Sequence, residues 1–333
     1  MSDDTYRLYG SELSPYSVKV RSYFRYKGLP HEWIPRSPAV QAEFQKYAKL
    51  PLVPLVVTPD GAGIQDSTPI MEQLEARHPE PSIVPADPTL AFLSALLEEY
   101  GDEWGNKWMF HYRWFYQPDV WATAERIALQ MMGASGTLAV AEARSAVAER
   151  MTGRLGFVGS SEQTRPTIEA SFKRVLALLE AHLAQRPYVL GGRPAMADFG
   201  LWGQLYEAAT DPTPGAVMRA SSPNVMAWVR RMLSPAAEGS YETWDALAPT
   251  LLPLLTQEVA GLFLPWSAAN EAAVKRDDKT FETSLAGTPW SQTPQKYHAR
   301  SLAEIRHKYK AVGAAPRLAA ILEQTGCLRY LAA

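Results

Sequence analysis

The feature that most constrains the fold is a proline-rich break between Pro79 and Pro88, which holds four prolines in ten residues. Proline cannot continue a helix and rarely sits in a central strand, so secondary-structure elements are expected to end there. Before the break, short runs rich in β-forming residues alternate with runs of helical spacing, whereas beyond it strand signals almost vanish. The chain is therefore predicted to hold an α/β domain followed by an all-α region.

The residues before the break predict the element order βαβαββα. Ser14-Pro15 and Gly28 are residue types that start and stop a helix, and Asp60-Gly61 is typical of a hairpin turn. Strands are expected at 5–9, 31–35, 53–58 and 64–65, and helices at 15–28, 39–50 and 67–78.

The residues after the break predict helices that proline or glycine mostly separates. These helices are expected at 89–115, 120–132, 138–152, 164–185, 198–210 and 224–233. In the remaining segment, helices are expected near 244–263 and 301–312, with a loop rich in Pro and Thr around 288–294. We interpret 1–82 as the first domain, 87–234 as an all-helical second domain, and 235–333 as a mostly helical extension packed on the second.

The composition excludes several classes of function. The 333 residues include 33 Lys and Arg against 35 Asp and Glu, and this balance gives no general attraction to nucleic acid or to an anionic membrane. A single cysteine, Cys327, rules out a disulfide framework and a multi-cysteine zinc site, and we expect it to be buried. Prolines interrupt the apolar stretch 247–266, which favours core helices over a membrane span. No signal peptide is recognised, so a cytoplasmic location is the default expectation.

Four local segments, in this order and spacing, resemble the glutathione transferase superfamily. Within residues 8–21, Ser14-Pro15-Tyr16-Ser17 occupies the position of a Cys-Pro-Tyr-Cys motif, and Val53-Pro54 opens a strand where the family has a cis-proline. The segment 65–70 is similar to the family's acidic turn before the third helix. The segment 193–205 is similar to the family's capping segment, in which Asp198 is the aspartate. The resemblance covers about 5–234 and implies a thioredoxin-like first domain with a helical-bundle second domain. Residues 235–333 match nothing in this pattern.

The resemblance implies that glutathione reacts here as a thiolate. A free thiol has a pKa of about 8.5, so a hydrogen-bond donor and a positive potential are needed beside the sulfur. Ser14 is expected to cap a helix and to keep its hydroxyl proton free for the thiolate, although it could be a cap only. The rival donors are Tyr9, Ser11, Tyr16 and Ser17. With no cysteine in the motif, thiol–disulfide exchange there is not expected.

The resemblance also implies a glutathione-binding half-site. Val53 and Pro54 would bind the cysteinyl backbone, and Asp66 and Ser67 would bind the γ-glutamyl end, where they also suit a helix start. The sequence departs from the family at Leu52, where a basic residue is frequent, although Lys49 is near. It departs again at Ala195, where a capping Ser or Thr is usual, so Asp198 is expected to cap through its own carboxylate.

An aromatic segment, 104–121, is expected to line the pocket for a hydrophobic electrophile through Trp104, Trp108, His111 and Tyr112. The alternative is that these rings pack against the added C-terminal segment. The spacing of Glu99, Glu103 and His111 along one helix would allow a metal site, but no metal is expected. A salt-bridged cluster of Glu99 and Glu103 with Lys107 and Arg113 is the more ordinary interpretation.

The function expected from the resemblance is a glutathione transferase with glutathione as co-substrate, and isomerase or dehalogenase chemistry would use the same half-site. The alternative is a non-catalytic binding or assembly module that acts through its extension. A homodimer is also implied by the resemblance. In the extension, Trp290 and Tyr297 flank Gln292 and Gln295 in a polar–aromatic patch to which the sequence assigns no role.

Overall fold

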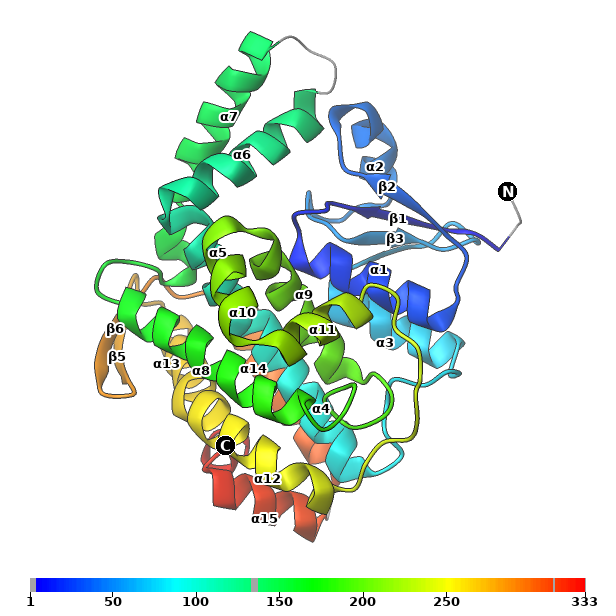
Figure 1. Cartoon of the computed structure of the whole chain (residues 1–333), viewed down its shortest axis with the longest axis vertical. Helices are drawn as coiled ribbons and strands as arrows, with labels where there is room; N and C mark the ends of the chain where they lie inside the picture. Colours follow the sequence, from blue (N-terminus) through cyan, green and yellow to red (C-terminus); the bar gives the residue numbers. More distant parts are fainter. Residues whose placement is uncertain (1–3, 133–136, 314, 333) are drawn as a thin grey trace.

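The computed structural model describes residues 4–132, 137–313 and 315–332. Its first part has the predicted order βαβαββα: β1 (Tyr6–Gly10), α1 (Pro15–Lys27), β2 (His31–Pro35), α2 (Gln41–Tyr47), β3 (Leu55–Val57), β4 (Gly63–Gln65) and α3 (Ser67–Arg77). The sheet order is β2-β1-β3-β4, and β1 runs parallel to β2 and antiparallel to β3. Figure 1 shows α1 and α3 on one face of this sheet and α2 on the other. This is the thioredoxin-like arrangement that was expected.

The start and stop signals of α1 act as predicted. Ser14 has an extended backbone and its side-chain oxygen accepts a hydrogen bond from the Ser17 amide at 3.3 Å, which satisfies one of the free donors of the first turn. Gly28 closes the helix in the left-handed conformation with φ 64°.

The helical part begins with one long rod that contains a π-helical turn. The rod consists of α4 (Pro88–Tyr100), the π segment Gly101–Gly105 and α5 (Asn106–Phe115). It is followed by α6 (Gln117–Met132), α7 (Thr137–Thr152), α8 (Arg165–Leu183), α9 (Met196–Thr210), α10 (Pro212–Ser221) and α11 (Pro223–Arg231). The sequence prediction missed α10. In Figure 1 the pair α6 and α7 projects away from the rest of the bundle.

The C-terminal segment is mostly helical, as expected, but it also contains a β-hairpin. Its elements are α12 (Trp244–Leu254), the π segment Leu255–Phe263, α13 (Leu264–Arg276), β5 (Phe281–Leu285), β6 (Thr288–Gln292), α14 (Lys296–Val312), α15 (Pro316–Thr325) and α16 (Leu328–Leu331). The loop predicted around 288–294 is therefore wrong in its first half, because β6 pairs with β5 over that stretch. Pro289 is tolerated because the sheet has only two strands, so β6 is an edge strand.

One helix in the described residues, Trp244–Arg276, is long and apolar enough to cross a membrane by length and composition. More than half of its most apolar window, 56%, is buried inside the protein, as in the core helix of a soluble protein. Cys327 lies beside this helix, fully buried, and burial raises the pKa of its thiol to about 11.

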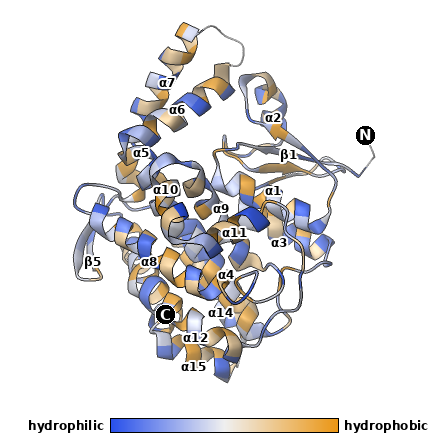
Figure 2. Cartoon of the chain, in the orientation of Figure 1, coloured by the Kyte–Doolittle hydropathy of each residue, from blue (hydrophilic) through white to orange (hydrophobic). Residues whose placement is uncertain are grey.

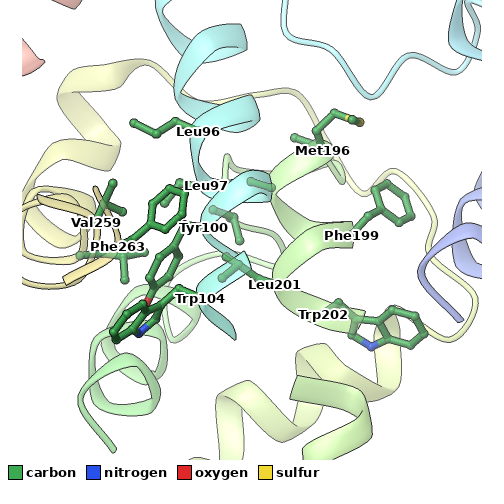
Figure 3. Packing of buried hydrophobic residues seen from close by; sticks show 14 of the residues in the cluster. Leu96, Leu97, Tyr100, Trp104, Met196, Phe199, Leu201, Trp202, Val259 and Phe263 are labelled. Carbon is green, nitrogen blue, oxygen red and sulfur yellow. The ribbon is translucent and has the colours of Figure 1, made fainter. Parts of the chain in front are cut away.

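The central rod packs between α9 and the π segment of the C-terminal part (Figure 3). On one side Gly101 lies against Gly200, where a Cβ on Gly101 would meet backbone at 2.6 Å, so the two helices approach at glycines. On the other side Tyr100 and Trp104 meet Phe263 and Trp266. Figure 2 shows hydrophobic and hydrophilic residues alternating along the helices of the bundle, and the buried hydrophobic residues at this contact belong to the main core cluster.

Asp198 has the structural role that was expected for it. Its carboxylate accepts hydrogen bonds from the Ala195 amide, the Val189 amide and the Trp228 indole, each at 2.9 Å. It thus caps α9 from within the helix, since Ala195 has no side-chain acceptor.

A buried histidine on α8 predicts acid sensitivity. His182 Nε2 lies 2.7 Å from the Val189 carbonyl, while Nδ1 faces the Thr250 hydroxyl at 2.7 Å and the Arg186 guanidinium at 3.1 Å. Nδ1 therefore accepts, and burial lowers the pKa of His182 from 6.5 to about 4. As the pH falls, His182 binds a proton in the unfolded chain before it does so in the folded chain. The stability that neutral His182 contributes is therefore fully present above pH 6.5 and is lost as the pH falls from 6.5 to 4.

We expect protonation of His182 alone to lower the free energy of unfolding by about 3 kcal/mol as the pH falls from 6.5 to 4. Urea titrations of the wild type and His182→Gln at several pH values would measure it as a pH-dependent difference between the two proteins. The control is His307→Gln, because His307 is exposed on α14. A difference that stays constant between pH 6.5 and 4 would contradict the assignment.

Candidate functional site

The candidate site is a cavity of about 400 Å³, within the size range of small-molecule sites. Segments far apart in the sequence line it: Tyr16 of α1, the loop before β3, the start of α3, the π segment with the start of α5, and the start of α14. A second cavity of about 390 Å³ lies between the linker near Asp87 and Arg317, away from these residues.

One wall of the cavity contains the predicted cis peptide. The Val53–Pro54 bond is cis, as predicted, and both residues line the cavity. The Gln65 side chain holds the preceding loop, because it accepts from the amides of Lys49 and Leu50 and donates to the carbonyls of Leu50 and Leu52. The loop is thereby fixed beside Val53.

Asp66 and Ser67 lie in the same wall, at the start of α3. Asp66 has a positive φ of 78°, rare for a residue with a side chain, and its carboxylate lines the cavity. Its Oδ2 accepts a hydrogen bond from the Tyr297 hydroxyl at 2.7 Å, across 231 residues of sequence. Burial and the nearby Asp66 carboxylate raise the pKa of Tyr297. The unassigned patch of the extension thus reaches the predicted γ-glutamyl site.

A buried charge network lies behind Ser67. Lys19 of α1 is completely buried and contacts the carboxylates of Glu98 and Asp102, the latter at 2.6 Å. The Ser67 hydroxyl is 3.4 Å from Asp102 Oδ2. Desolvation raises the pKa of Asp102 to about 7, although Lys19 opposes it. This network could not be predicted from the sequence, since Lys19 sits in a helix like any surface lysine.

The five candidate hydroxyls lie in different surroundings. Of these, only Tyr16 belongs to the described residues that line the cavity; its hydroxyl donates to the Asp102 carbonyl at 3.0 Å and accepts from Asn106 Nδ2 at 2.6 Å. Ser14 caps α1 next to it, and its hydroxyl oxygen is the acceptor. Ser11 accepts from an amide in its own turn, and Ser17 and Tyr9 are buried. Contact between Ser14 and a thiolate stays a prediction.

The four side chains expected to line the substrate pocket lie in the core instead. Trp104, Trp108, His111 and Tyr112 are all nearly or fully buried, and none of them borders the cavity. Both indoles donate to Ser171, and the Trp104 ring packs 5.5 Å from Trp290 of the hairpin. The expectation is therefore corrected. Trp104 packs against the C-terminal segment, as in the alternative, whereas Trp108 and Tyr112 pack against Phe172 of α8.

His111 and Tyr112 are held away from the cavity by their own partners. The two imidazole nitrogens of His111 face Ser160 and Glu169, and the Tyr112 ring stacks on Tyr116. The residues of the rod that do border the cavity are Glu103, Asn106 and Lys107.

The ion cluster expected among Glu99, Glu103, Lys107 and Arg113 does not form. Arg113 pairs with Glu207 and Asp211, at 2.7 and 2.6 Å, whereas Glu103 contacts His298 and Glu99 contacts Ser301, both of α14. The partners come from distant segments, which sequence spacing along one helix cannot reveal. Within the described ranges, no group of three or more His, Cys, Asp or Glu side chains is arranged to hold a metal ion.

Lys107 has no carboxylate partner among the interactions of the described residues. Its ammonium nitrogen donates to the Val158 carbonyl at 3.0 Å and lies 3.7 Å from the centre of the Trp266 ring, with Trp104 and Trp290 farther out. Burial holds its pKa well below the usual value. The residue is thus enclosed beside the cavity.

Part of the cavity lining is apolar and exposed. Leu50, Leu52 and Phe157 all line the cavity, and each residue is more than half exposed. Large exposed apolar side chains in a lining favour an apolar ligand over a fully polar one.

Two families match the sequence: "Glutathione S-transferase, N-terminal domain" over residues 8–82 and "Glutathione S-transferase, C-terminal domain" over 139–231. Among curated proteins, none matches the chain.

Solved structures to which the chain is similar include a glutathione S-transferase from Methylobacterium radiotolerans in complex with glutathione sulfonate (21% identity, 74% of this chain and 94% of that chain, TM-score 0.44). Others are a glutathione S-transferase from Rhodospirillum rubrum (17% identity, 89% and 99%, TM-score 0.47) and the β-etherase LigF from Sphingobium (20% identity, 74% and 98%, TM-score 0.47).

Proposed function

This chain belongs to the glutathione S-transferase superfamily, and from that premise we propose that it is an enzyme that binds glutathione and attacks a hydrophobic electrophile with the glutathione thiolate. The observation that carries the proposal is the meeting of the cis Val53–Pro54 peptide, Asp66 and Ser67 in one cavity. Each supplies a group that a γ-glutamyl-cysteinyl peptide needs.

Different residues would bind different parts of the peptide. The backbone of Val53 before the cis-proline would pair with the cysteinyl unit. The Asp66 carboxylate would accept from the ammonium, and Ser67 with the first turn of α3 would hold the α-carboxylate. A group that binds through two charged ends is fixed in orientation as well as position.

The chemistry would consist of stabilising a thiolate and holding it beside the electrophile. The start of α1, with its partial positive charge, and the free hydroxyl proton of Ser14 would lower the thiol pKa. The electrophile would pack against Leu52 and Phe157, which are exposed and line the cavity. A cytoplasmic homodimer is the form we propose, by likeness to the family.

Isothermal titration calorimetry with glutathione tests the binding step. We expect saturable binding at millimolar concentrations or below, and a loss of about 10- to 100-fold in affinity for Asp66→Asn, because the ammonium loses its charged acceptor. Asp60→Asn is the matched control, since Asp60 is exposed in the β3–β4 turn of the same domain.

Wild-type protein that shows no saturable heat up to several millimolar glutathione would end the enzyme proposal. The alternative, a binding or assembly module that acts through residues 235–333, would then be the better description.

A further inference from the structure

The start of α14 places a histidine against a buried carboxylate inside the cavity. Nδ1 of His298 contacts Oε2 of Glu103, which belongs to the π segment of the central rod. Glu103 is 5% exposed and both residues line the cavity. The His298 ring is held edge-on against Trp266 at 4.9 Å between ring centres.

This arrangement leaves the second ring nitrogen of His298 available. A carboxylate beside Nδ1 favours the tautomer with the proton on Nδ1, and then Nε2 carries the lone pair. Among the described residues Nε2 makes no hydrogen bond, whereas Nδ1 and Glu103 Oε2 are both buried and have no hydrogen-bond partner besides their close contact with each other. Burial lowers the pKa of His298 to about 4, so the imidazole of the free protein is neutral at pH 7. It can hold a proton at that pH only beside a new negative charge, and a bound thiolate would supply one.

We propose that His298, positioned by Glu103, is a catalytic base that accepts the thiol proton of the cavity-bound peptide, so that the C-terminal extension supplies part of the active site. The proposal rests on the proposed glutathione site. His298 is adjacent in sequence to Tyr297, whose hydroxyl already touches Asp66. A ligand held by Asp66 and Val53 therefore shares the cavity with His298.

The charged and titratable groups around His298 are few. Glu103 faces Nδ1 from the π segment, Tyr297 precedes it on α14, and Lys107 and Asp66 border the same cavity. Lys107 is a poorer base for this position because its nitrogen is engaged by Val158 and enclosed by tryptophan rings. The Tyr16 hydroxyl is also engaged, as donor to Asp102 and acceptor from Asn106.

The proton balance is simple. The S–H bond breaks, the proton moves to Nε2, and the sulfur keeps the electron pair as a thiolate beside an imidazolium. Glu103 stabilises the imidazolium from the far side, in the manner of a carboxylate–histidine pair. The thiolate then forms the S–C bond. In a substitution the leaving group departs with its electron pair, and in an addition the carbanion takes the proton back from Nε2.

The test measures ionisation of the bound thiol without any electrophile. The ultraviolet absorbance of the thiolate is recorded against pH for protein saturated with glutathione. We expect an apparent pKa below that of the free thiol in the wild type, and a rise of about one unit or more in His298→Gln with the calorimetric affinity changed by less than about threefold. Glu103→Gln should shift the pKa in the same direction by less. His307→Gln, on the exposed side of the same helix, should leave it unchanged.

The possible results separate this inference from the function it builds on. Glutathione that binds but keeps the same thiol pKa in His298→Gln as in the wild type overturns the role of His298 and leaves the binding site intact. No binding to the wild type overturns both. If His298→Gln does not fold, the thiol pKa in Glu103→Gln and nitrogen NMR of labelled histidines in the wild type test the proposal instead. Saturation of the wild type with glutathione at neutral pH should produce one new imidazolium signal. The absence of that signal rejects the proposal.

Discussion

Replacing Lys19 with methionine is expected to lower the free energy of unfolding by about 3–5 kcal/mol. Lys19 is fully buried and contacts the carboxylates of Glu98 and Asp102, which are almost as deeply buried. Methionine has a similar length but no charge, so two acidic groups would remain in the core without a cation. Chemical denaturation at pH 7 measures the loss directly.

Two further variants make this prediction sharp. Lys46→Met should change stability by less than about 1 kcal/mol, because Lys46 is 64% exposed and pairs with Glu43 at the surface. Adding Glu98→Gln and Asp102→Asn to Lys19→Met should recover part of the loss, since the buried negative charges are then removed. A single Lys19→Met variant with wild-type stability would show that the network contributes nothing.

The second large effect is expected from deletion of residues 235–333, which should leave a chain that does not fold cooperatively. The deletion removes Trp266 and Trp290, both nearly or fully buried against Trp104. Loss of a buried tryptophan side chain costs about 3–5 kcal/mol, and two such losses approach the whole stability of a typical domain, about 5–15 kcal/mol. Glu258, which accepts from the Tyr100 hydroxyl at 2.9 Å, is lost as well.

The measurement is the thermal unfolding transition and the soluble yield of the truncated chain. A matched control keeps every buried residue but disturbs the extension: a short Gly-Ser insertion between Ala286 and Gly287, in the exposed turn of the hairpin, should leave the transition nearly unchanged. A soluble, cooperatively unfolding 1–234 fragment would contradict the prediction and would mean that the extension is a dispensable addition.

The features that could be predicted from the sequence are those whose causes are local. Ser14-Pro15 and Gly28 mark the ends of α1 through capping and a left-handed residue, and these depend on a few neighbouring residues only. The cis Val53–Pro54 bond and the capping role of Asp198 were also expected, from their position in a resembling family pattern. The predicted order βαβαββα follows from such local signals.

The features that could not be predicted depend on contacts across long stretches of sequence. Glu103 meets His298 and Asp66 meets Tyr297, pairs separated by about 200 residues or more. Nothing in the spacing of His298 marks it as a site residue. The nearest signal was the unassigned polar–aromatic patch around Trp290 and Tyr297, which the structure divides between the core and the cavity.

The aromatic segment of the rod shows why composition alone did not decide between core and pocket. Trp104 and Trp108 share one helical face, and such a face suits either a ligand or a packed neighbour. The C-terminal segment supplies the neighbour of Trp104 and α8 supplies that of Trp108, so the polar residues Glu103 and Asn106 border the cavity instead. Only the positions of these distant segments, for which the sequence has no local signal, settle the choice.

Because Tyr297 of α14 donates its hydroxyl to Asp66, the docking of α14 and the occupancy of the cavity are thermodynamically coupled. A ligand that strengthens or weakens this hydrogen bond changes the free energy with which α14 docks. By reciprocity, the docking of α14 changes the free energy of ligand binding by the same amount. Lys308, on the same helix, also pairs with Glu72 of α3, so the helix is attached to the first domain at two points. Amide hydrogen exchange along α14 should therefore report, residue by residue, on whether the proposed γ-glutamyl site beside Tyr297 is filled.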